Sequence, residues 1–358
     1  MKNYYYPQSK KNFFIIILFL LLNWFYLNAQ EEKNYRIACI AFYNLENLFD
    51  TKDDEGVNDE EYTPVGDKNL NAEKYSKKLK NMASVIAQIG TDLSPDGPAV
   101  LGVSEIENKG VLEDLVKEET IKTRNYQIVH YDSPDRRGVD VGFLYNPKYF
   151  KVTNSAKYRL VVEVEDGEEP FLTRDQLLVS GMLDGDPLHI IVNHWPSRRG
   201  GEKRSRPMRN AAADLCRSIT DSILNLDPNA KVIIMGDLND DPNNESVKQH
   251  LIAVGNKDKL DKGELYNTME PLFRNGIGSL AYQDSWNLFD QIIITPGLLG
   301  EDKSTYMFHK AFVFNKNFLK QQSGRYKGYP LRTFAGGVYT AGYSDHFPTY
   351  IFLIKEVR

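Results

Sequence analysis

Short apolar runs that stop abruptly at acidic and amide residues constrain the fold of this 358-residue chain more than any other feature. The clearest example is KVIIMGDLNDDPNN at residues 231–244, where the apolar run reaches a glycine and then Asp237 and Asn239. A turn would explain this cluster, because Gly, Asp and Asn suit turn conformations. A buried strand of an α/β sheet ends in the same way, and such folds place their sites beyond the carboxyl ends of strands. This stretch alone leaves both interpretations open.

The same pattern recurs along the chain. Apolar runs begin or end at side chains that can bind a metal or move a proton: Asn44, Glu105, Asp140, His194, Asp237 with Asn239, Asp290, and Asp345 with His346. Carboxylate and amide oxygens suit Mg²⁺, with Mn²⁺ or Ca²⁺ as alternatives. No zinc motif, Walker-type phosphate loop or Gly-x-Ser-x-Gly elbow accompanies them. The repetition therefore favours a hard-cation site over a set of unrelated caps.

Strand and helix patterns alternate through the chain. Residues 71–90 and 208–226 have helical spacing, whereas residues 126–147 and 174–197 are typical of hairpins, and a further strand is predicted at 158–166. No linker rich in Pro, Gly or Ser divides the chain. We expect one α/β domain, residues 30–358, with mixed sheets.

The N-terminus predicts a secretory signal peptide over residues 1–29. Lys10 and Lys11 precede the apolar run 13–27, and Ala29 is a suitable cleavage residue. A membrane anchor is the alternative, but the run is shorter than the roughly 20 residues that a spanning helix needs. We expect an exported protein, periplasmic or extracellular, with no transmembrane segment in the mature chain.

The chain contains two cysteines, Cys39 and Cys216. Export would permit a disulfide, yet both lie in apolar patterns that are typical of core positions. A bridge between them stays open at the level of sequence.

The formal net charge of −5 does not favour binding of polyanions through bulk charge. A basic segment directly follows His194, and we interpret its arginines, Arg198, Arg199 and Arg204, together with Arg137, as ligands of substrate phosphate. The alternative is a solvated, flexible loop.

An acidic stretch, residues 50–67, resembles a calcium-binding loop only superficially. With Gly56 at the sixth position, Thr51 and Tyr62 would occupy positions that require carboxylates. We interpret the stretch as a solvated insertion with weak attraction for cations.

Seven motifs make a family recognisable. AFYNLEN, GVSEIEN, RRGVDVGFLY, VNHWPSR, GDLND, FDQIII and SDHFPT follow the order found in the endonuclease/exonuclease/phosphatase superfamily, from about residue 35 to 354. The segments around HWPSRRGG and SPDRRGVDVGFLY are similar to secreted bacterial nucleases. The resemblance implies a DNase I-like fold, a four-layered α/β sandwich of two packed mixed β-sheets flanked by helices. It also implies metal-assisted attack of water on a phosphoester.

The resemblance also implies a metal site. Glu105 matches the metal-ligating glutamate, Asn44 lies beside the same ion, and Asp345 lies near it. Glu107 is an alternative to Glu105.

The remaining matches are catalytic. Asp237 would orient or deprotonate the attacking water, and Asn239 would contact the phosphate. The resemblance gives the two histidines distinct roles: His346, held by Asp290, would contact the scissile phosphate, and His194, oriented by Asp140, would protonate the leaving oxygen.

We therefore expect a Mg²⁺-dependent endonuclease that cleaves DNA with low sequence specificity, with RNA as an alternative substrate and no stable protein partner. One alternative is a phosphodiesterase or phosphatase for phospholipid head groups or sugar phosphates, for which residues 296–308 offer an apolar loop. Another is an inactive binding module on the same fold.

Overall fold

The computed structural model describes residues 1–2, 34–162 and 171–357. Residues 37–355 form one compact unit. Apart from its first two residues, the predicted signal peptide lies outside the described residues. No helix in the described part of the chain combines the length and apolarity needed to cross a bilayer.

Two β-sheets pack face to face. The first has the strand order β14-β17-β1-β2-β4-β3 and the second β5-β6-β7-β8-β13-β10-β9. In the first sheet the bounds are β1 (Tyr35–Leu48), β2 (Pro98–Ile106), β3 (Gln127–His130), β4 (Asp140–Tyr145), β14 (Met307–Val313) and β17 (Thr349–Glu356). In the second they are β5 (Phe150–Tyr158), β6 (Gln176–Leu183), β7 (Asp186–His194), β8 (Val232–Asp237), β9 (Ala253–Val254), β10 (Leu265–Asn267) and β13 (Asp290–Ile294). Parallel pairs such as β1/β2 and β7/β8 lie beside antiparallel ones, so both sheets are mixed.

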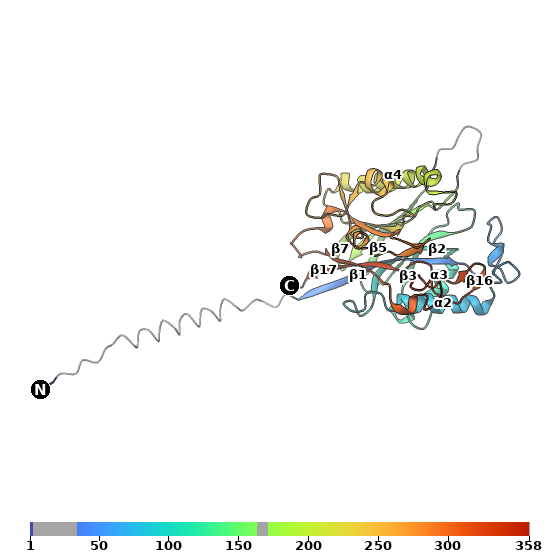
Figure 1. The fold of residues 1–358 in the computed structure, drawn as a ribbon. Coiled ribbons are helices and arrows are strands. Elements are labelled where there is room, and N and C mark those ends of the chain that lie inside the picture. The colour runs from blue at the N-terminus through green and yellow to red at the C-terminus, as the bar shows by residue number, and fades with distance from the viewer. Residues whose placement is uncertain (3–33, 163–170, 358) are drawn as a thin grey trace. The chain divides into compact units, whose positions relative to one another are not determined.

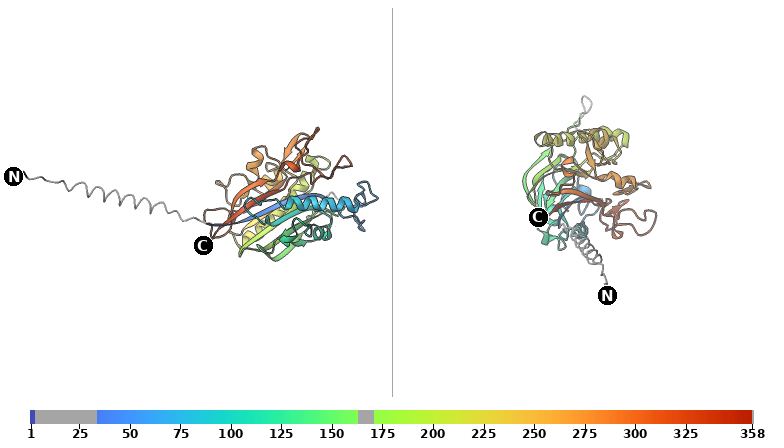
Figure 2. Two further views of the ribbon diagram at one scale, coloured as in Figure 1. Left: turned by 90° about the horizontal axis from the view of Figure 1, so that it is seen from below. Right: turned by 90° about the vertical axis from the view of Figure 1, so that its left-hand side faces the viewer.

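Helices cover both outer faces. Helices α2 (Ala72–Ile86) and α3 (Lys109–Leu115) pack on the first sheet, and α4 (Glu202–Leu226) packs on the second, as Figure 1 shows. The view from below in Figure 2 shows α2 running along the first sheet. Asn71 and Asn108 cap α2 and α3 by accepting hydrogen bonds from backbone N–H groups of the first turn. The arrangement confirms the predicted four-layered sandwich.

The remaining elements are short. They are α5 (Glu270–Arg274), the strands β11 (Leu280–Tyr282), β12 (Ser285–Asn287), β15 (Phe334–Ala335) and β16 (Val338–Tyr339), the 3₁₀ helices at Glu60–Tyr62, Lys122–Arg124, Pro296–Leu298 and Asn317–Leu319, and a π-helical turn at Ser246–His250.

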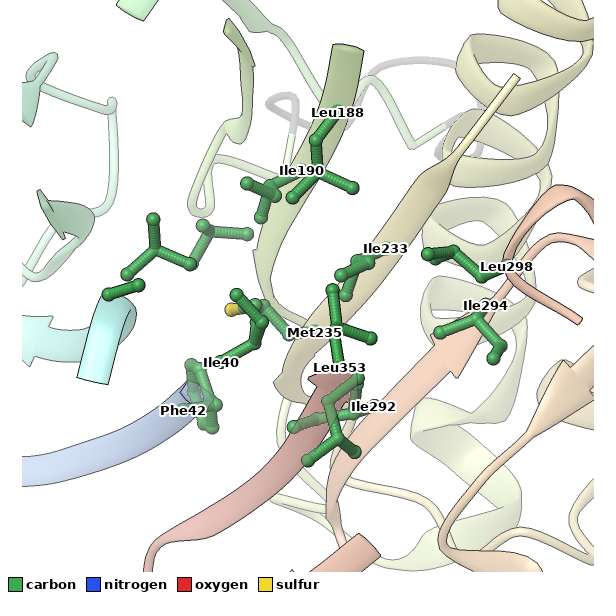
Figure 3. Close-up of a cluster of buried hydrophobic side chains, with 14 of the residues drawn as sticks. Ile40, Phe42, Leu188, Ile190, Ile233, Met235, Ile292, Ile294, Leu298 and Leu353 are labelled. Atoms are coloured by element: carbon green, nitrogen blue, oxygen red, sulfur yellow. The ribbon is translucent and has the colours of Figure 1, made fainter. Parts of the chain in front are cut away.

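Strand periodicity divides the core into layers. On β1, Cys39 and Ala41 face α2, while Ile40 and Phe42 face the second sheet. Figure 3 shows the inter-sheet layer, in which Ile40 and Phe42 lie opposite residues of β8 and β13 such as Met235. This layer fixes the two sheets against each other, so that strand ends of both sheets can build one site.

Three expectations about local structure are wrong. Helix α4 begins at Glu202 and not near residue 208, so much of the basic segment is helical. Strand β5 ends at Tyr158, residues 159–162 form no strand, and the rest of the strand predicted at 158–166 lies outside the described residues. Strand β1 continues past Asn44 to Leu48, with an irregular register against β2.

The cysteines do not form a disulfide. Both are free and buried, Cys39 on β1 beneath α2 and Cys216 on the buried face of α4, in clusters on opposite sides of the sandwich.

Candidate active site

Strands of both sheets meet at one edge of the sandwich. Parallel pairing aligns His194 with Asp237 across β7 and β8, and antiparallel pairing places Asp290 at the start of β13 beside Asp237. In the first sheet, Asn44 pairs with Ser104, next to Glu105. Five of the predicted residues therefore lie together at this edge: Asn44, Glu105, His194, Asp237 and Asp290.

Two backbone features place the carboxylates. Glu105 lies at a β-bulge between Ser104 and Ile106 and has a φ of 57°, a left-handed conformation that costs a non-glycine residue about 1–3 kcal/mol. Gly236 precedes Asp237, and a Cβ there would come within 2.3 Å of the carbonyl oxygen of Asn193. The bulge directs Glu105 out of the strand, and the glycine lets β8 lie close to β7.

Asn44 joins the two carboxylates. Its Nδ2 donates to Glu105 Oε1 at 3.3 Å and to Asp237 Oδ2 at 3.0 Å. Its Oδ1 accepts from the N–H of Glu46 at 2.9 Å, so this oxygen is already engaged. Asn44 therefore lies beside the carboxylates, as expected, but it presents its amino group to them.

The outer oxygens of both carboxylates are held by backbone N–H groups. Glu105 Oε2 accepts from Asn47 at 3.0 Å, and Asp237 Oδ1 accepts from Asn239 at 2.9 Å. Each residue consequently keeps one oxygen directed at the other sheet's carboxylate. The side chain of Asn239 is nearly buried and donates to the carbonyl of Trp195 at 3.0 Å.

His194 faces the same carboxylates. Its Nε2 lies 3.8 Å from Glu105 Oε1 and 3.7 Å from Asp237 Oδ2. Its Nδ1 is buried and has no hydrogen-bond partner among the described residues. Burial lowers the pKa of His194 well below its ordinary value, and the cations Arg174 and Arg137 lower it further. The ring is neutral in this environment, and its expected role as a proton donor stays a prediction.

His346 has the partner that the sequence predicted. Its Nδ1 lies 2.6 Å from Asp290 Oδ2, and its Nε2 lies 3.9 Å from Asp237 Oδ2. Burial alone would lower the pKa of His346, but the carboxylates of Asp290 and Asp237 outweigh it and hold this pKa well above its ordinary value. The ring is therefore a fixed, cationic N–H donor.

The donor set fits a hard divalent cation. Ligand atoms of Glu105, His194 and Asp237 all lie within 4.8 Å of one another. Burial raises the pKa of Asp237 to about 7, and the neighbouring carboxylates Asp290 and Glu105 add to the effect of burial. Asp237 is buried and Glu105 is half-buried, and a bound cation would stabilise the ionised form of both carboxylates.

Asp345 has other partners. Its Oδ2 accepts from Arg332, whose guanidinium also lies 3.3 Å from Glu46 Oε1. Glu46 is in turn 3.6 Å from the buried Lys78. Asp345 is adjacent to His346 in the chain, but it belongs to this charge network and not to the cluster of Glu105 and Asp237.

The expected pairing of Asp140 with His194 is wrong. Asp140 Oδ2 lies 2.9 Å from His130 Nε2, and its Oδ1 accepts from the N–H of Ser133. The antiparallel pairing of β3 with β4 brings His130 beside Asp140. What orients His194 is its backbone: Arg174, paired with Asp135, donates to the carbonyls of His194 and Trp195.

The basic segment after His194 is largely structural. Arg198 donates to Asp240 and to the carbonyl of Asn239 and lies over the ring of Phe289. Arg209 is fully buried and lies 2.8 Å from Asp240.

Arg199, Arg204 and Arg137 are exposed, and their predicted contact with phosphate stays a prediction. Trp195 is buried, so it cannot stack on a base.

The apolar segment 296–308 is no membrane-facing loop. Leu298 and Tyr306 are buried, and Leu299 and Phe308 pack against the inter-sheet core.

Two hollows adjoin the site. A groove of about 650 Å³ is lined by aromatic and cationic side chains that include Arg198, Phe289, Tyr282, Tyr326 and Arg325. A smaller pocket of about 230 Å³ is lined by Phe49, Tyr62, Lys68 and Lys78, among others. Both include Arg332, next to Asp345.

Sequence reasoning missed Arg332 and the tyrosines of the groove. They lie in irregular segments and short hairpins, where no strand or helix period marks them.

Solved structures share this fold. The chain resembles an endonuclease/exonuclease/phosphatase family protein from Bacteroides thetaiotaomicron (16% identity, TM-score 0.53, covering 91% of this chain and 98% of that one). It is also similar to D. rerio TDP2 complexed with single strand DNA product (14% identity, TM-score 0.52, covering 88% of this chain and 98% of that one). A third similar structure is the catalytic domain of human Nocturnin (15% identity, TM-score 0.51, covering 91% of this chain and 98% of that one). No curated protein sequence matches the chain.

A family profile covers almost all of the compact unit. The profile described as Endonuclease/Exonuclease/phosphatase family matches residues 39–355, which include every strand end of the candidate site. This chain therefore belongs to the endonuclease/exonuclease/phosphatase family.

Proposed function

We propose that this protein is a Mg²⁺-dependent phosphodiesterase that acts as an endonuclease on DNA with little sequence preference. The observation that carries the proposal is the convergence of Glu105, Asp237 and the His346–Asp290 pair at one edge of the two sheets. Family membership supports phosphoester hydrolysis, and the surroundings of the site support the choice of substrate.

Glu105 and Asp237 would hold the cation. Mg²⁺ is usually bound by one or two carboxylates together with substrate phosphate oxygens, which this donor set suits better than a complete protein cage. A bound Mg²⁺ would neutralise phosphate charge, polarise the P–O bond and lower the pKa of water. Mn²⁺ or Ca²⁺ would satisfy the same donors.

The protein's own groups supply orientation and charge. His346 would donate its Nε2–H to a phosphate oxygen, and Asp290 fixes the tautomer and supports the cationic ring. Asp237 would accept a proton from the attacking water through Oδ2, while Oδ1 stays anchored on the N–H of Asn239. His194 lies beside the same carboxylates and would face the leaving oxygen.

The two hollows favour a chain-like substrate over a small one. Arg332 lines both hollows, and their linings include Asn47 and Asp345, which neighbour the residues of the site. Arginine guanidinium groups bind phosphate oxygens, and tyrosine rings stack on bases of any sequence. Tyr282 and Tyr326 are 65% and 49% exposed, so their faces are available for stacking.

A substrate and cation screen tests the proposal. The purified protein is incubated with plasmid DNA, a DNA oligonucleotide, RNA, sphingomyelin vesicles, inositol phosphate and bis-p-nitrophenyl phosphate, each with Mg²⁺, Mn²⁺, Ca²⁺ or EDTA. We expect nicking of plasmid with Mg²⁺, none with EDTA, and binding to DNA that weakens steeply with salt. Hydrolysis of lipid or sugar phosphates with intact nucleic acid would replace the substrate assignment, and no hydrolysis of any phosphoester would refute the proposal.

Matched variants identify the site in the same screen. Glu105→Gln should lower the cleavage rate by about 100-fold or more and raise the Mg²⁺ concentration needed for half-maximal rate. Glu113→Gln removes an exposed glutamate on α3 that pairs with Lys109, and it should retain the full rate. Equal rates for the two variants would show that Glu105 does not hold the cation.

We also infer that the chain is exported and cleaved after Ala29. The basic start and short apolar run of residues 1–29 support this inference. Fractionation of a bacterial host followed by N-terminal sequencing tests it. A chain that stays in the cytoplasm with its leader intact would contradict export.

A further inference from the structure

A second carboxylate cluster lies beneath the acidic loop that follows β1. Its members are Asp54 and Asp59 of the loop and Glu107 at the end of β2, and their ligand oxygens all lie within 4.8 Å of one another. The loop is drawn onto Glu107 because the N–H of Asp50 donates to Glu107 Oε2 at 2.6 Å. The N–H of Asp54 donates to Asp59 Oδ2 at 3.1 Å, which closes the loop on itself.

The inner oxygens of this cluster lack partners. Asp59 is 1% exposed and Glu107 is 5% exposed. Asp59 Oδ1 and Glu107 Oε1 are buried and accept no hydrogen bond within the described part of the chain. An ionised carboxylate without a donor is costly to bury, and two that face each other are costlier still. A bound cation, or a proton shared between the two carboxyls, must offset this cost.

We infer that Asp54, Asp59 and Glu107 bind a structural Ca²⁺ ion. Calcium takes oxygen ligands at about 2.3–2.6 Å, so two of its ligands can lie up to roughly 5 Å apart, which matches the observed spacing. Its coordination is flexible and accepts the irregular geometry of a loop, whereas Mg²⁺ demands a nearly ideal octahedron. Asp54 is exposed and gives the ion a route from solvent.

The proposed ion would connect the acidic loop to the catalytic edge. Glu107 lies two residues after Glu105 in the chain, and its backbone N–H donates to the carbonyl of Leu48. The N–H of Asn47, one residue before Leu48, holds Glu105 Oε2. A Ca²⁺ ion bound to Glu107 and the acidic loop would stabilise both segments that position Glu105, the end of β1 and the end of β2. The ion would not contact substrate.

Thermal unfolding of the intact protein tests the site without any measurement of activity. The melting temperature is followed as Ca²⁺ is added in the presence of saturating Mg²⁺, so that the catalytic donors are already occupied. A ligand at 100 times its dissociation constant should raise the melting temperature by about 5 °C. Terbium luminescence excited through tyrosine, which includes Tyr62 of the same loop, reports binding directly.

Two variants in one loop distinguish specific Ca²⁺ coordination from non-specific attraction of cations by an acidic loop. Asp59→Asn should weaken Ca²⁺ binding at least tenfold and abolish the thermal shift, whereas Asp53→Asn, an exposed position in the same loop, should keep both. Glu105→Gln should also keep the shift, which separates this site from the catalytic one.

A wild-type protein that gains no thermal stability from Ca²⁺ would overturn the inference, since the two carboxyls would then share a proton. Equal losses of Ca²⁺ affinity and of the thermal shift in Asp59→Asn and Asp53→Asn would overturn the inference as well.

Discussion

Two histidine–aspartate pairs with buried side chains have similar separations, although they use different ring nitrogens, Nδ1 in His346 and Nε2 in His130. His346 and Asp290 approach to 2.6 Å, and His130 and Asp140 approach to 2.9 Å. The difference lies in the second nitrogen of each ring. That of His346 faces the buried Asp237, whereas that of His130 lies 3.8 Å from Asp132, which is 91% exposed.

The pairs also differ in what they connect. His346–Asp290 joins the segment before β17, in the first sheet, to the start of β13 in the second. His130–Asp140 closes a single hairpin, β3 and β4. A histidine–aspartate pair is therefore not a site by itself, and the third group and the junction of two sheets give the first pair its chemistry.

Removing the imidazole ring of each pair should give the largest difference in cleavage rate between the two pairs. His346→Ala should lower the rate of DNA cleavage by about 10²–10⁴-fold, because a fixed cationic donor to phosphate is lost. His130→Ala should leave the rate within about threefold and lower stability by about 1–3 kcal/mol, because a buried hydrogen bond is lost. Steady-state cleavage and denaturant unfolding of both variants measure the two effects. Unchanged cleavage by His346→Ala would refute the mechanism for any substrate.

Neutralising the aspartate of each pair should give a smaller difference in cleavage rate. Asp290→Asn keeps the shape but removes the charge that supports the ring of His346, so we expect cleavage to fall about 10- to 100-fold. Asp140→Asn should alter cleavage little. If both variants lost activity equally, the pair on β3 and β4 would belong to the site after all.

The sequence predicted the elements of the site better than their partners. Glu105 and Asp237 stand at strand ends, where apolar runs stop, and His346 precedes β17; the fold brings all three to one edge. Spacing along the chain cannot show which carboxylate a ring will meet, because the partner depends on hairpin geometry, and so Asp140 was assigned to the wrong histidine.

The basic segment shows a different limit of the sequence. Its position after His194 predicts phosphate binding, but two of its arginines lie against the acidic residues after β8. Arg198 and Arg209 both contact Asp240. A charge run has no fixed meaning until the structure shows which opposite charges fold onto it.

Substitution of the groove's aromatic wall should weaken substrate binding without affecting either pair. Tyr282→Ala should raise the dissociation constant for a single-stranded DNA oligonucleotide about tenfold and leave kcat nearly unchanged, because stacking on one base contributes about 1–3 kcal/mol. Tyr131→Ala removes an exposed ring that bonds Ser155 outside the groove and serves as the control. Equal binding by the two variants would place the DNA elsewhere.

His189 extends the comparison to a histidine that is bonded to a hydroxyl group, and its effect can be measured as the pH dependence of stability. His189 Nδ1 lies 2.8 Å from the hydroxyl of Ser180, and burial lowers the pKa of His189 below the ordinary value of 6.5, an effect that the more distant carboxylate of Asp227 only partly offsets. The unfolded chain then binds a proton more readily than the folded one just below pH 6.5, and stability contributed by neutral His189 falls as the pH drops through that window. His189→Gln should make the free energy of unfolding less dependent on pH there, as measured by urea unfolding between pH 5 and about pH 7. An unchanged slope would mean that His189 titrates alike in both states, and that a hydroxyl partner can offset burial as a carboxylate does for His346.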